Sequence, residues 1–407
     1  MQDSKFSCTE KTSFVTQEMM KETAKSKNQL TVGIPKEYCD EEKRLALTPE
    51  AVGMIVEAGH RVVLETEAGQ GINYSDNRYS ECGAEIEKDK ETVFQSDIIL
   101  KILPPTTEEI NMMKHRATVC SMLQLSGFSK ETILAMTGKK LNGTGYELIS
   151  EDNGKSYPVR TAISEIEGAA SISIASELLS NTHGGKGILL GGVSGVSPTE
   201  IVIIGAGAAG TVATRAALAM GATVKVFDND INKLRNIQSA LGRALFTSVF
   251  QPNVLLNAFR TADVAIGAME YFDASSSIRY VIPEDMIKTM KKGASLIDLR
   301  VNQGGCFETS CFLPQNHPEI FEKYGVLHYC VPNLSSRVAR TASMALSNIF
   351  IPFIMQMGES GGFQAMTKSD YGFHSGFYMY GGKLVNSYVA RYFNLPSNDI
   401  GLFLSAY

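Results

Sequence analysis

Alternating apolar and polar positions near the start of the chain predict a β-strand. Leu30, Val32 and Ile34 alternate with Thr31 and Gly33, and this two-residue period is typical of a strand with one buried face. Regular structure is therefore expected to begin at the segment LTVGI.

A helix is expected soon after this strand. Thr48 can serve as its N-cap, Pro49 fits the first helical position, and Glu50 places a carboxylate at the positive end of the helix dipole. The following apolar run stops at Gly59, which suits a helix C-terminus. The segment HRVVLET predicts a second strand and DIILKIL, residues 97–103, predicts another, so this part of the chain forms an α/β region.

The second half of the chain repeats the alternation more regularly. The expected strands are IVIIG, TVKVF, VAIGAM and SLIDLRV, with helices near 208–220, 231–241, 254–261 and 283–291. Such alternation favours a parallel, doubly wound sheet. After the strand GVLHYCV, residues 337–357 predict a long apolar helix that Pro352 is expected to kink.

These elements predict a two-domain α/β protein, with a Rossmann-type doubly wound parallel domain and a discontinuous α/β domain. The expected division is a flexible extension at 1–28, the discontinuous domain at 29–158 and 339–407, and the Rossmann domain at 159–338. A long amphipathic helix near 162–181 and the glycine-rich stretch HGGKGILLGGVSGV mark the junction. A targeting role is the alternative to a mobile extension at 1–28.

The most informative motif is a glycine-rich turn between the strand IVII and a helical run. It is formed by Gly205, Ala206, Gly207, Ala208, Ala209 and Gly210, a GxGxxG pattern. The first glycine permits a tight turn, the second lets a pyrophosphate approach the backbone, and the third lets helix and strand pack closely. Asp228, at the end of the next strand, would bind ribose hydroxyls and repel a 2′-phosphate, which favours NAD over NADP. The alternatives are a flavin site and a nucleotide fold that binds no dinucleotide.

Composition argues against several other classes of protein. Lys plus Arg total 38 and Asp plus Glu total 43, and the resulting net charge of −5 argues against a nucleic-acid or anionic-membrane binder. Seven scattered cysteines, without a CxxC pair or a cysteine–histidine cluster, indicate reduced thiols in a cytoplasm and support no metal site. The sequence also presents no signal peptide and no long uninterrupted apolar run, so no membrane segment is expected.

Several motifs together resemble the alanine dehydrogenase family, which is related to the NAD-binding domain of proton-translocating transhydrogenase. They are VGIPKE, KRLALTPE, ISEIEG, GILLGGVSGV, VIIGAGAAG, LIDLRVNQGGCFE and YCVPN, and the resemblance runs from about Thr31 to the C-terminus. It implies an NAD-dependent enzyme that interconverts L-alanine, or a related small amino acid, with the keto acid and ammonia. It also implies a substrate domain and an NAD-binding domain around a cleft, and usually a homohexamer.

The resemblance assigns site residues one position at a time. Arg44, in KRLALTP, matches the arginine that binds the substrate carboxylate. Leu103, in ILKILPP, stands where the family has a lysine, and Gln124, in LQL, stands where it has the catalytic histidine. Asn302, in VNQGGCFE, replaces an aspartate. Three of the four expected polar site residues are therefore changed.

The resemblance also implies cofactor contacts besides the glycine-rich turn and Asp228. These are Ser164 in ISEIEG, Gly267 and Ala268 in VAIGAM, Asn302, and Asn333 in YCVPN near the nicotinamide.

The replaced positions bear on proton transfer. Dehydrogenation of an amino acid needs a group that takes the amine or carbinolamine proton, and an amide side chain cannot do so near neutral pH. Gln124 and Asn302 could still orient a substrate by hydrogen bonds. Glu147, Glu167 and Tyr146 are candidate proton carriers, with a structural role as the alternative for each.

Two further cations are candidates for substrate binding. By strand alternation, Lys101 is expected to share a face with Leu103, and Arg300 to share a face with Asn302. Together with Arg44 they could form an anion pocket. The alternative is that Lys101 and Arg300 are charges with partners elsewhere in the protein.

Three functions follow from these observations. The leading hypothesis is a cytoplasmic NAD-dependent dehydrogenase, a homo-oligomer, that acts on a small amino or keto acid. The second is an NAD(H)-binding protein, a sensor or an assembly subunit, which has lost dehydrogenase activity through the changes at Leu103, Gln124 and Asn302. The third is a transhydrogenase-like subunit.

Overall fold

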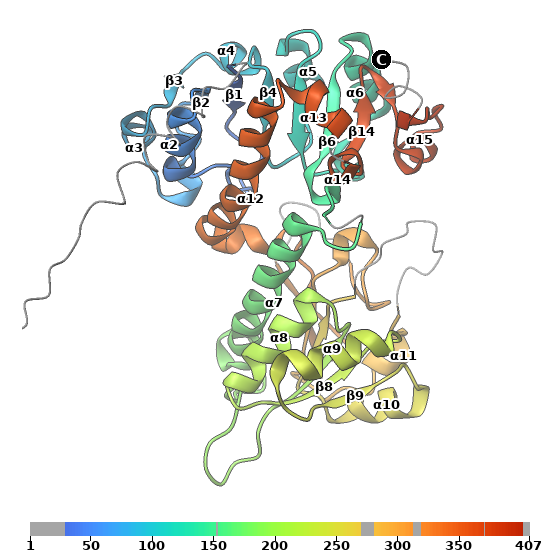
Figure 1. Cartoon of the computed structure of the whole chain (residues 1–407). Helices are drawn as coiled ribbons and strands as arrows, with labels where there is room; N and C mark the ends of the chain where they lie inside the picture. Colours follow the sequence, from blue (N-terminus) through green and yellow to red (C-terminus); the bar gives the residue numbers. More distant parts are fainter. Residues whose placement is uncertain (1–28, 152–153, 270–280, 312–318, 370, 402–407) are drawn as a thin grey trace, which may run out of the picture. The chain divides into compact units, whose positions relative to one another are not determined.

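The computed structural model describes residues 29–151, 154–269, 281–311, 319–369 and 371–401 (Figure 1). The chain divides into two compact units, and each is an α/β structure. Among the described residues, the first unit contains 29–40, 45–151, 154–155, 346–369 and 371–401, and the second contains 41–44, 156–269, 281–311 and 319–345. The extension expected at 1–28 lies outside the described residues.

The described part of the first unit is built on an eight-stranded sheet in the order β15-β14-β6-β5-β4-β1-β2-β3. Its strands are β1 Thr31–Ile34, β2 Arg61–Glu65, β3 Glu85–Glu87, β4 Ile98–Leu100, β5 Thr118–Ser121, β6 Asn142–Gly145, β14 Phe377–Tyr380 and β15 Lys383–Leu384. The strands from β6 to β3 are parallel, while β14 and β15 pair antiparallel at one edge.

Helices and short turns connect the strands of this unit. The helices are α2 Pro49–Glu57, α3 Asp76–Glu81, α4 Lys90–Phe94, α5 Thr107–Met112, α6 Lys130–Gly138, α13 Phe363–Ser369, α14 Tyr371–His374 and α15 Ser387–Tyr392. The 3-10 turns are η1 Gln70–Ile72, η2 Leu125–Gly127 and η3 Tyr146–Leu148. The expected start of α2 is confirmed, with Pro49 in the first turn and Thr48 extended at the N-cap.

The strand expected at 97–103 is wrong in its extent, because β4 ends at Leu100. The amides of Ile102 and Leu103 turn toward the Glu37 carboxylate, which accepts both at 2.5 and 3.3 Å. Strand alternation therefore does not fix the relative directions of Lys101 and Leu103.

The described part of the second unit is built on a seven-stranded sheet in the order β12-β13-β11-β10-β7-β8-β9. Its strands are β7 Glu200–Ile204, β8 Thr223–Phe227, β9 Phe246–Ser248, β10 Val264–Gly267, β11 Ser295–Asp298, β12 Ile320–Lys323 and β13 Val326–Tyr329. Its helices and turns are α7 Pro158–Leu179, α8 Ala208–Ala219, α9 Ile231–Leu241, α10 Pro252–Thr261, α11 Glu284–Ile287, η4 Asn181–His183, η5 Val301–Gln303 and η6 Leu334–Val338.

The two faces of this sheet bury separate cores, which confirms the doubly wound fold. Ile201 and Ile203 of β7 pack with residues of α7, α8 and α9, whereas Val202 and Ile204 pack with residues of α10. All pairs are parallel except β12 with β13. The chain leaves β7 in one direction to β8 and later returns on its other side to β10, so the carboxyl ends of β7 and β10 flank the crevice where open α/β sheets bind ligands.

Some elements of the second unit differ from the sequence prediction. The edge strands β9 and β12 were not expected, because short and partly exposed strands carry little hydrophobic signal. Helix α11 covers only Glu284–Ile287 instead of 283–291.

The long apolar helix near the C-terminus is α12, Ala339–Glu359, with Pro352 inside it. Together with η6 it forms a stretch, Leu334–Glu359, that is long and apolar enough to cross a membrane by length and composition, with mean hydropathy 1.4. Ser343, Ser347 and Pro352 interrupt its apolar residues, so the sequence does not present it as one continuous run. One such helix is weak evidence, because a core helix of a soluble protein can have the same composition.

Candidate functional site

The glycine-rich turn between β7 and α8 is the centre of the candidate site in the second unit. Gly205 has φ +110°, and a Cβ there would lie 2.6 Å from the backbone of Ala268, at the end of β10. A Cβ on Gly210 would lie 1.9 Å from the carbonyl oxygen of Gly205. Gly207 is the extended N-cap of α8 and offers no side-chain cap to the first amides of the helix. Helix amides without a side-chain cap are suited to bind a phosphate.

Asp228 directly follows β8 and is buried. Its Oδ2 accepts the amide of Ala206 at 2.8 Å, and its Oδ1 accepts the amide of Asp230 at 2.9 Å. The carboxylate therefore fastens the end of β8 to the glycine-rich turn. These residues fit a dinucleotide, because the two glycines leave no room for side chains at the turn and the acid lies where a ribose would bind.

Arg300 contacts α7, the helix that packs against α8. Its Nη2 donates to Ser164 Oγ at 3.0 Å, and its Nη1 donates to Glu167 Oε2 at 3.2 Å. One helical turn further, α7 passes close to α8, since a Cβ on Gly168 would lie 2.3 Å from the carbonyl oxygen of Ala209. Ser164, an expected cofactor residue, is buried, and its hydrogen bond brings it together with Arg300.

The expectation that Arg300 and Asn302 share a strand face is wrong. Strand β11 ends at Asp298, and Asn302 lies in the 3-10 turn η5. Arg300 is buried, whereas Asn302 is exposed. The turn forms because Asp298 accepts the amides of Arg300 and Cys306 at 2.9 and 2.7 Å, which draws the chain out of the sheet.

Asp298 organises residues 300–310 of the loop after β11. Besides those two amides, its carboxylate accepts the Ser310 hydroxyl at 2.5 Å. Burial raises the pKa of Asp298, and these hydrogen bonds oppose that shift. The sequence reasoning missed this residue, although its position at the end of a buried parallel strand marks a place where functional side chains gather.

His328, in β13, contacts the same loop at Thr309. Its Nδ1 lies 2.9 Å from the Val326 carbonyl oxygen, and its Nε2 lies 2.8 Å from Thr309 Oγ1. A carbonyl only accepts, so Nδ1 carries the proton and Nε2 accepts from the threonine hydroxyl. The ring is fully buried, and burial lowers the pKa of His328 to about 4.

We expect this histidine to make the protein less stable in acid. The pKa of His328 is about 4 in the folded protein and about 6.5 in the unfolded chain, so the unfolded chain binds the proton more readily. The stability that comes from the neutral, buried ring is therefore fully present above pH ~6.5 and is lost as the pH falls toward 4. Comparison of the free energy of unfolding at pH 7 and pH 4.5 should show a larger acid loss in the wild type than in His328→Gln, by on the order of 2–3 kcal/mol. Equal losses in the two proteins would contradict the assignment.

Arg44 belongs to the second unit and is buried. Glu42 clamps it with a two-pronged carboxylate, accepting Nε at 2.7 Å and Nη2 at 2.5 Å, while Nη1 donates to Ser335 Oγ at 2.9 Å. Ser335 lies in η6, which Asn333 precedes with a left-handed φ of +56°. Glu42 therefore fixes the direction of the guanidinium, a role that the sequence reasoning did not assign.

Lys101 lies in the first unit and is enclosed by carboxylates. Its Nζ lies 2.8 Å from Glu109 Oε2 and 3.7 Å from Glu37 Oε2, and it stands 4.9 Å from the centre of the Tyr38 ring. Burial, with the nearby carboxylates, raises the pKa of Tyr38 to about 12. The ammonium thus has two anionic partners within the protein, and the adjacent Leu103 is buried.

Gln124 follows β5 in the first unit, as the half-buried residue before η2. The preceding residue, Leu123, donates its amide to Glu147 Oε1 at 2.6 Å, so the Glu147 carboxylate binds the backbone one residue before Gln124. Tyr146 is buried, donates to the Ile102 carbonyl at 3.4 Å and packs edge-on against Phe350. Of the three candidate proton carriers, Glu147 and Tyr146 thus bond to backbone groups, and Glu167 pairs with Arg300.

Two buried thiols, Cys120 and Cys306, are poorly suited to nucleophilic chemistry. Burial raises the pKa of the Cys120 thiol to about 12 and that of Cys306 well above its usual value, so neither is a ready nucleophile. Among the residues that the structure describes, no group of three His, Cys, Asp or Glu side chains could hold a metal ion.

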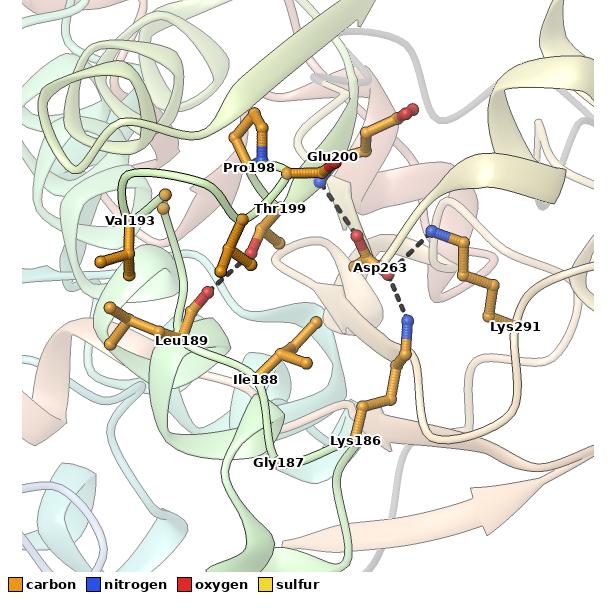
Figure 2. A pocket seen from close by; sticks show the side chains of 14 residues that line it. Lys186, Gly187, Ile188, Leu189, Val193, Pro198, Thr199, Glu200, Asp263 and Lys291 are labelled. Atoms are coloured by element: carbon orange, nitrogen blue, oxygen red, sulfur yellow. Dashed lines mark hydrogen bonds and ion pairs between the residues drawn. The ribbon is translucent and has the colours of Figure 1, made fainter.

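A cavity of about 470 Å³ opens at the opposite, amino-terminal edge of the second sheet (Figure 2). Lys186 and Lys291 both point toward the buried carboxylate of Asp263, with Nζ–Oδ1 distances of 2.5 and 2.9 Å. The other oxygen of Asp263 accepts the amide of Glu200 at 3.0 Å. Because Asp263 already pairs with both lysines and lies far along the strands from the glycine-rich turn, this cavity is not the candidate site.

Fold and site together define a Rossmann-type dinucleotide-binding protein with a second α/β unit. Comparison with known proteins shows which family of this class the chain resembles. The sequence profile of the alanine dehydrogenase/PNT N-terminal domain matches residues 33–167, and that of the C-terminal domain of the same family matches residues 171–387.

Individual relatives agree over nearly the whole chain. Alanine dehydrogenase of Staphylococcus saprophyticus is 34% identical over 371 residues, covering 91% of this chain and 99% of that protein. Alanine dehydrogenase of Bacillus subtilis is 34% identical over 83% of this chain and 88% of its own length.

Solved structures show the same fold. An L-alanine dehydrogenase superposes with a TM-score of 0.83 at 30% identity, covering 90% of this chain and 99% of that one. A transhydrogenase from Sinorhizobium meliloti superposes with a TM-score of 0.72 at 24% identity, over 88% and 99% of the two chains, and shows the fold alone.

The chain belongs to the alanine dehydrogenase/PNT family. It is accordingly an NAD-dependent oxidoreductase of the alanine dehydrogenase type, acting on small molecules.

Proposed function

We propose that the protein interconverts L-alanine, or a related small amino acid, with the corresponding keto acid and ammonia. The observation that carries this proposal is the intact dinucleotide turn, with Gly205 against β10 and Asp228 bonded to Ala206, in a chain that matches alanine dehydrogenases along most of its length. NAD, when bound, takes the hydride from the substrate carbon.

Unit 2 would hold the cofactor and part of the substrate. Gly205 to Gly210 and Asp228 would bind the pyrophosphate and a ribose, while Ser164, Gly267, Ala268, Asn302 and Asn333 would line the nicotinamide side. Arg44, oriented by Glu42, would bind the substrate carboxylate, because a planar guanidinium matches that group.

Proton transfer at this site would need a group other than the amides. Gln124 and Asn302 can donate and accept hydrogen bonds to the substrate but cannot carry a proton near neutral pH. Two carboxylates are candidates for this role. Glu167 pairs with Arg300 beside Ser164, and Glu147 accepts the amide of Leu123, the residue before Gln124. Leu103 and Lys101 remain candidates for contacts with the substrate from the first unit.

We also propose, from the family resemblance, that the protein is cytoplasmic and forms a homohexamer.

The second candidate function is an NAD(H)-binding protein without dehydrogenase activity, or a transhydrogenase-like subunit. It is favoured by the apolar and amide residues at Leu103, Gln124 and Asn302.

The test measures NADH oxidation by absorbance with pyruvate plus ammonium, beside a panel of other keto acids, with NADPH as the control. We expect turnover with NADH and a keto acid, and little with NADPH because Asp228 repels a 2′-phosphate. Tight NADH binding without turnover of any keto acid would reject the proposal and favour the second candidate. Turnover by the wild-type protein would reject the second candidate, an NAD(H)-binding protein without dehydrogenase activity.

A further inference from the structure

The guanidinium of Arg300 is only partly bonded. Nη1 reaches Glu167 and Nη2 reaches Ser164, but Nε is buried and has no hydrogen-bond partner among the described atoms. Arg300 is 7% exposed, so bulk water does not supply the missing acceptor. A buried charged donor without an acceptor is costly, and such groups in native proteins commonly await a ligand, ion or water.

The comparison with Arg44 shows what the open edge of Arg300 would fit. In Arg44, the Nε and Nη2 edge meets both oxygens of the Glu42 carboxylate. In Arg300, the same edge meets a single serine hydroxyl through Nη2, and Nε is left over. Parallel donors on this edge match the two oxygens of a carboxylate.

The position of Arg300 favours substrate over the adenosine end of the dinucleotide. It follows β11, whose neighbour β10 ends at Gly267 against the glycine-rich turn. Asp228 marks the adenosine side, on β8, which lies across β7 from β10. Arg300 is therefore on the opposite side of the crevice, where the reacting end of the dinucleotide would lie.

Two arginines are thus held in the same unit. Arg44 is fixed through Ser335 in η6, and Arg300 is fixed through Ser164 and Glu167 in α7, which contacts η6. A carboxylate sets the direction of each, Glu42 for Arg44 and Glu167 for Arg300.

We propose that Arg300 is a specificity-determining residue that binds a second acidic group of the substrate, so that the preferred substrate is a dicarboxylic amino acid or its keto acid. The proposal rests on the proposed function and makes its substrate class more specific. The substrate carboxylate would accept Nε–H and share Nη2–H with Ser164, while Glu167 keeps the guanidinium in place.

The test compares Arg300→Lys, which keeps the charge but removes the paired edge, with Arg235→Lys, a matched change at an exposed arginine of α9. In the NADH complex, affinities for glutarate and for propionate are measured by NADH fluorescence. The wild type and R235K should bind glutarate at least about 10-fold more tightly than propionate, as a charged hydrogen-bonded pair provides. R300K should abolish this preference while leaving the affinities for propionate and NADH within about twofold.

Three results would overturn the inference: no preference for glutarate in the wild type, a preference that R300K leaves unchanged, or a loss of NADH affinity in R300K with the preference intact. The last result would assign Nε to the cofactor. If R300K does not fold, Arg300→Met combined with Glu167→Met removes the two charges together and replaces it in the binding measurements alone, because Glu167 is also a candidate proton carrier.

Turnover separates this inference from the function on which it rests. Turnover of 2-oxoglutarate or oxaloacetate well above pyruvate, reduced about 10-fold or more in R300K, supports both. Turnover of pyruvate without a dicarboxylate preference rejects the inference and keeps the function. A glutarate preference that depends on Arg300, without turnover of any keto acid, rejects the function and leaves the recognition site.

Discussion

Replacement of Gly205 by alanine should lower the affinity for NADH by about 100-fold or more. The backbone at Gly205 has φ +110°, a conformation that costs an L residue roughly 1–3 kcal/mol. In addition, a Cβ would lie 2.6 Å from the carbonyl group of Ala268 and 2.7 Å from the amide of Met269. Both contacts are with the backbone of the segment after β10, so neither neighbour can rotate away. The turn must move, and its amides then no longer converge on a phosphate.

The measurement is a fluorescence titration with NADH, accompanied by thermal unfolding of the same samples. Gly138→Ala is the matched control, because Gly138 ends α6 in the first unit and a Cβ there meets nothing within 4 Å. That variant should bind NADH normally and be as stable as the wild type or slightly more stable, since alanine favours a helix by up to ~1 kcal/mol over glycine. Normal NADH affinity in a folded Gly205→Ala protein would show that the turn does not hold the dinucleotide.

Replacement of Lys101 by methionine should destabilise the protein by about 3–5 kcal/mol. The side chains of Lys101, Glu37 and Glu109 are at most 3% exposed, and the lysine is 2.8 Å from Glu109 and 3.7 Å from Glu37. Removal of the ammonium takes away the buried cation that Glu37 and Glu109 share, and leaves Glu109 with the partly exposed Lys90. Glu109 also closes the capping box of α5 with Thr106, so the start of that helix should loosen as well.

Denaturant unfolding of the purified variant gives the free energy directly. Lys90→Met is the control, because Lys90 pairs with the other oxygen of Glu109 at 3.3 Å but is one-third exposed. Glu109 is buried but Lys90 is partly solvated, so this variant should lose clearly less stability than Lys101→Met, whose ion pairs are buried on both sides. Addition of Glu109→Gln to Lys101→Met should recover part of the loss by removing one stranded charge. If Lys101→Met lowers the free energy of unfolding by less than ~1 kcal/mol, Lys101 is not a structural cation, and its proposed role in substrate binding would be favoured instead.

The sequence by itself determined the features that depend on local pattern. The βα alternation of the second unit, the glycine-rich turn after β7 and the acid at the end of β8 all follow from periodicity and from backbone conformations that only glycine adopts readily. Arg44 was found by its motif. These signals extend over a few residues, so they survive without knowledge of the rest of the fold.

Only the tertiary structure decided what the charged residues touch. Lys101 meets Glu37 and Glu109, which come from a different loop and a different helix, and Arg300 meets Ser164 and Glu167 from more than a hundred residues earlier in the chain. Strand alternation could not supply these partners, because the strands end at Leu100 and Asp298, just before the cations. Where a strand ends depends on which distant carboxylate accepts the next amides. That is a property of packing between segments rather than of the local sequence.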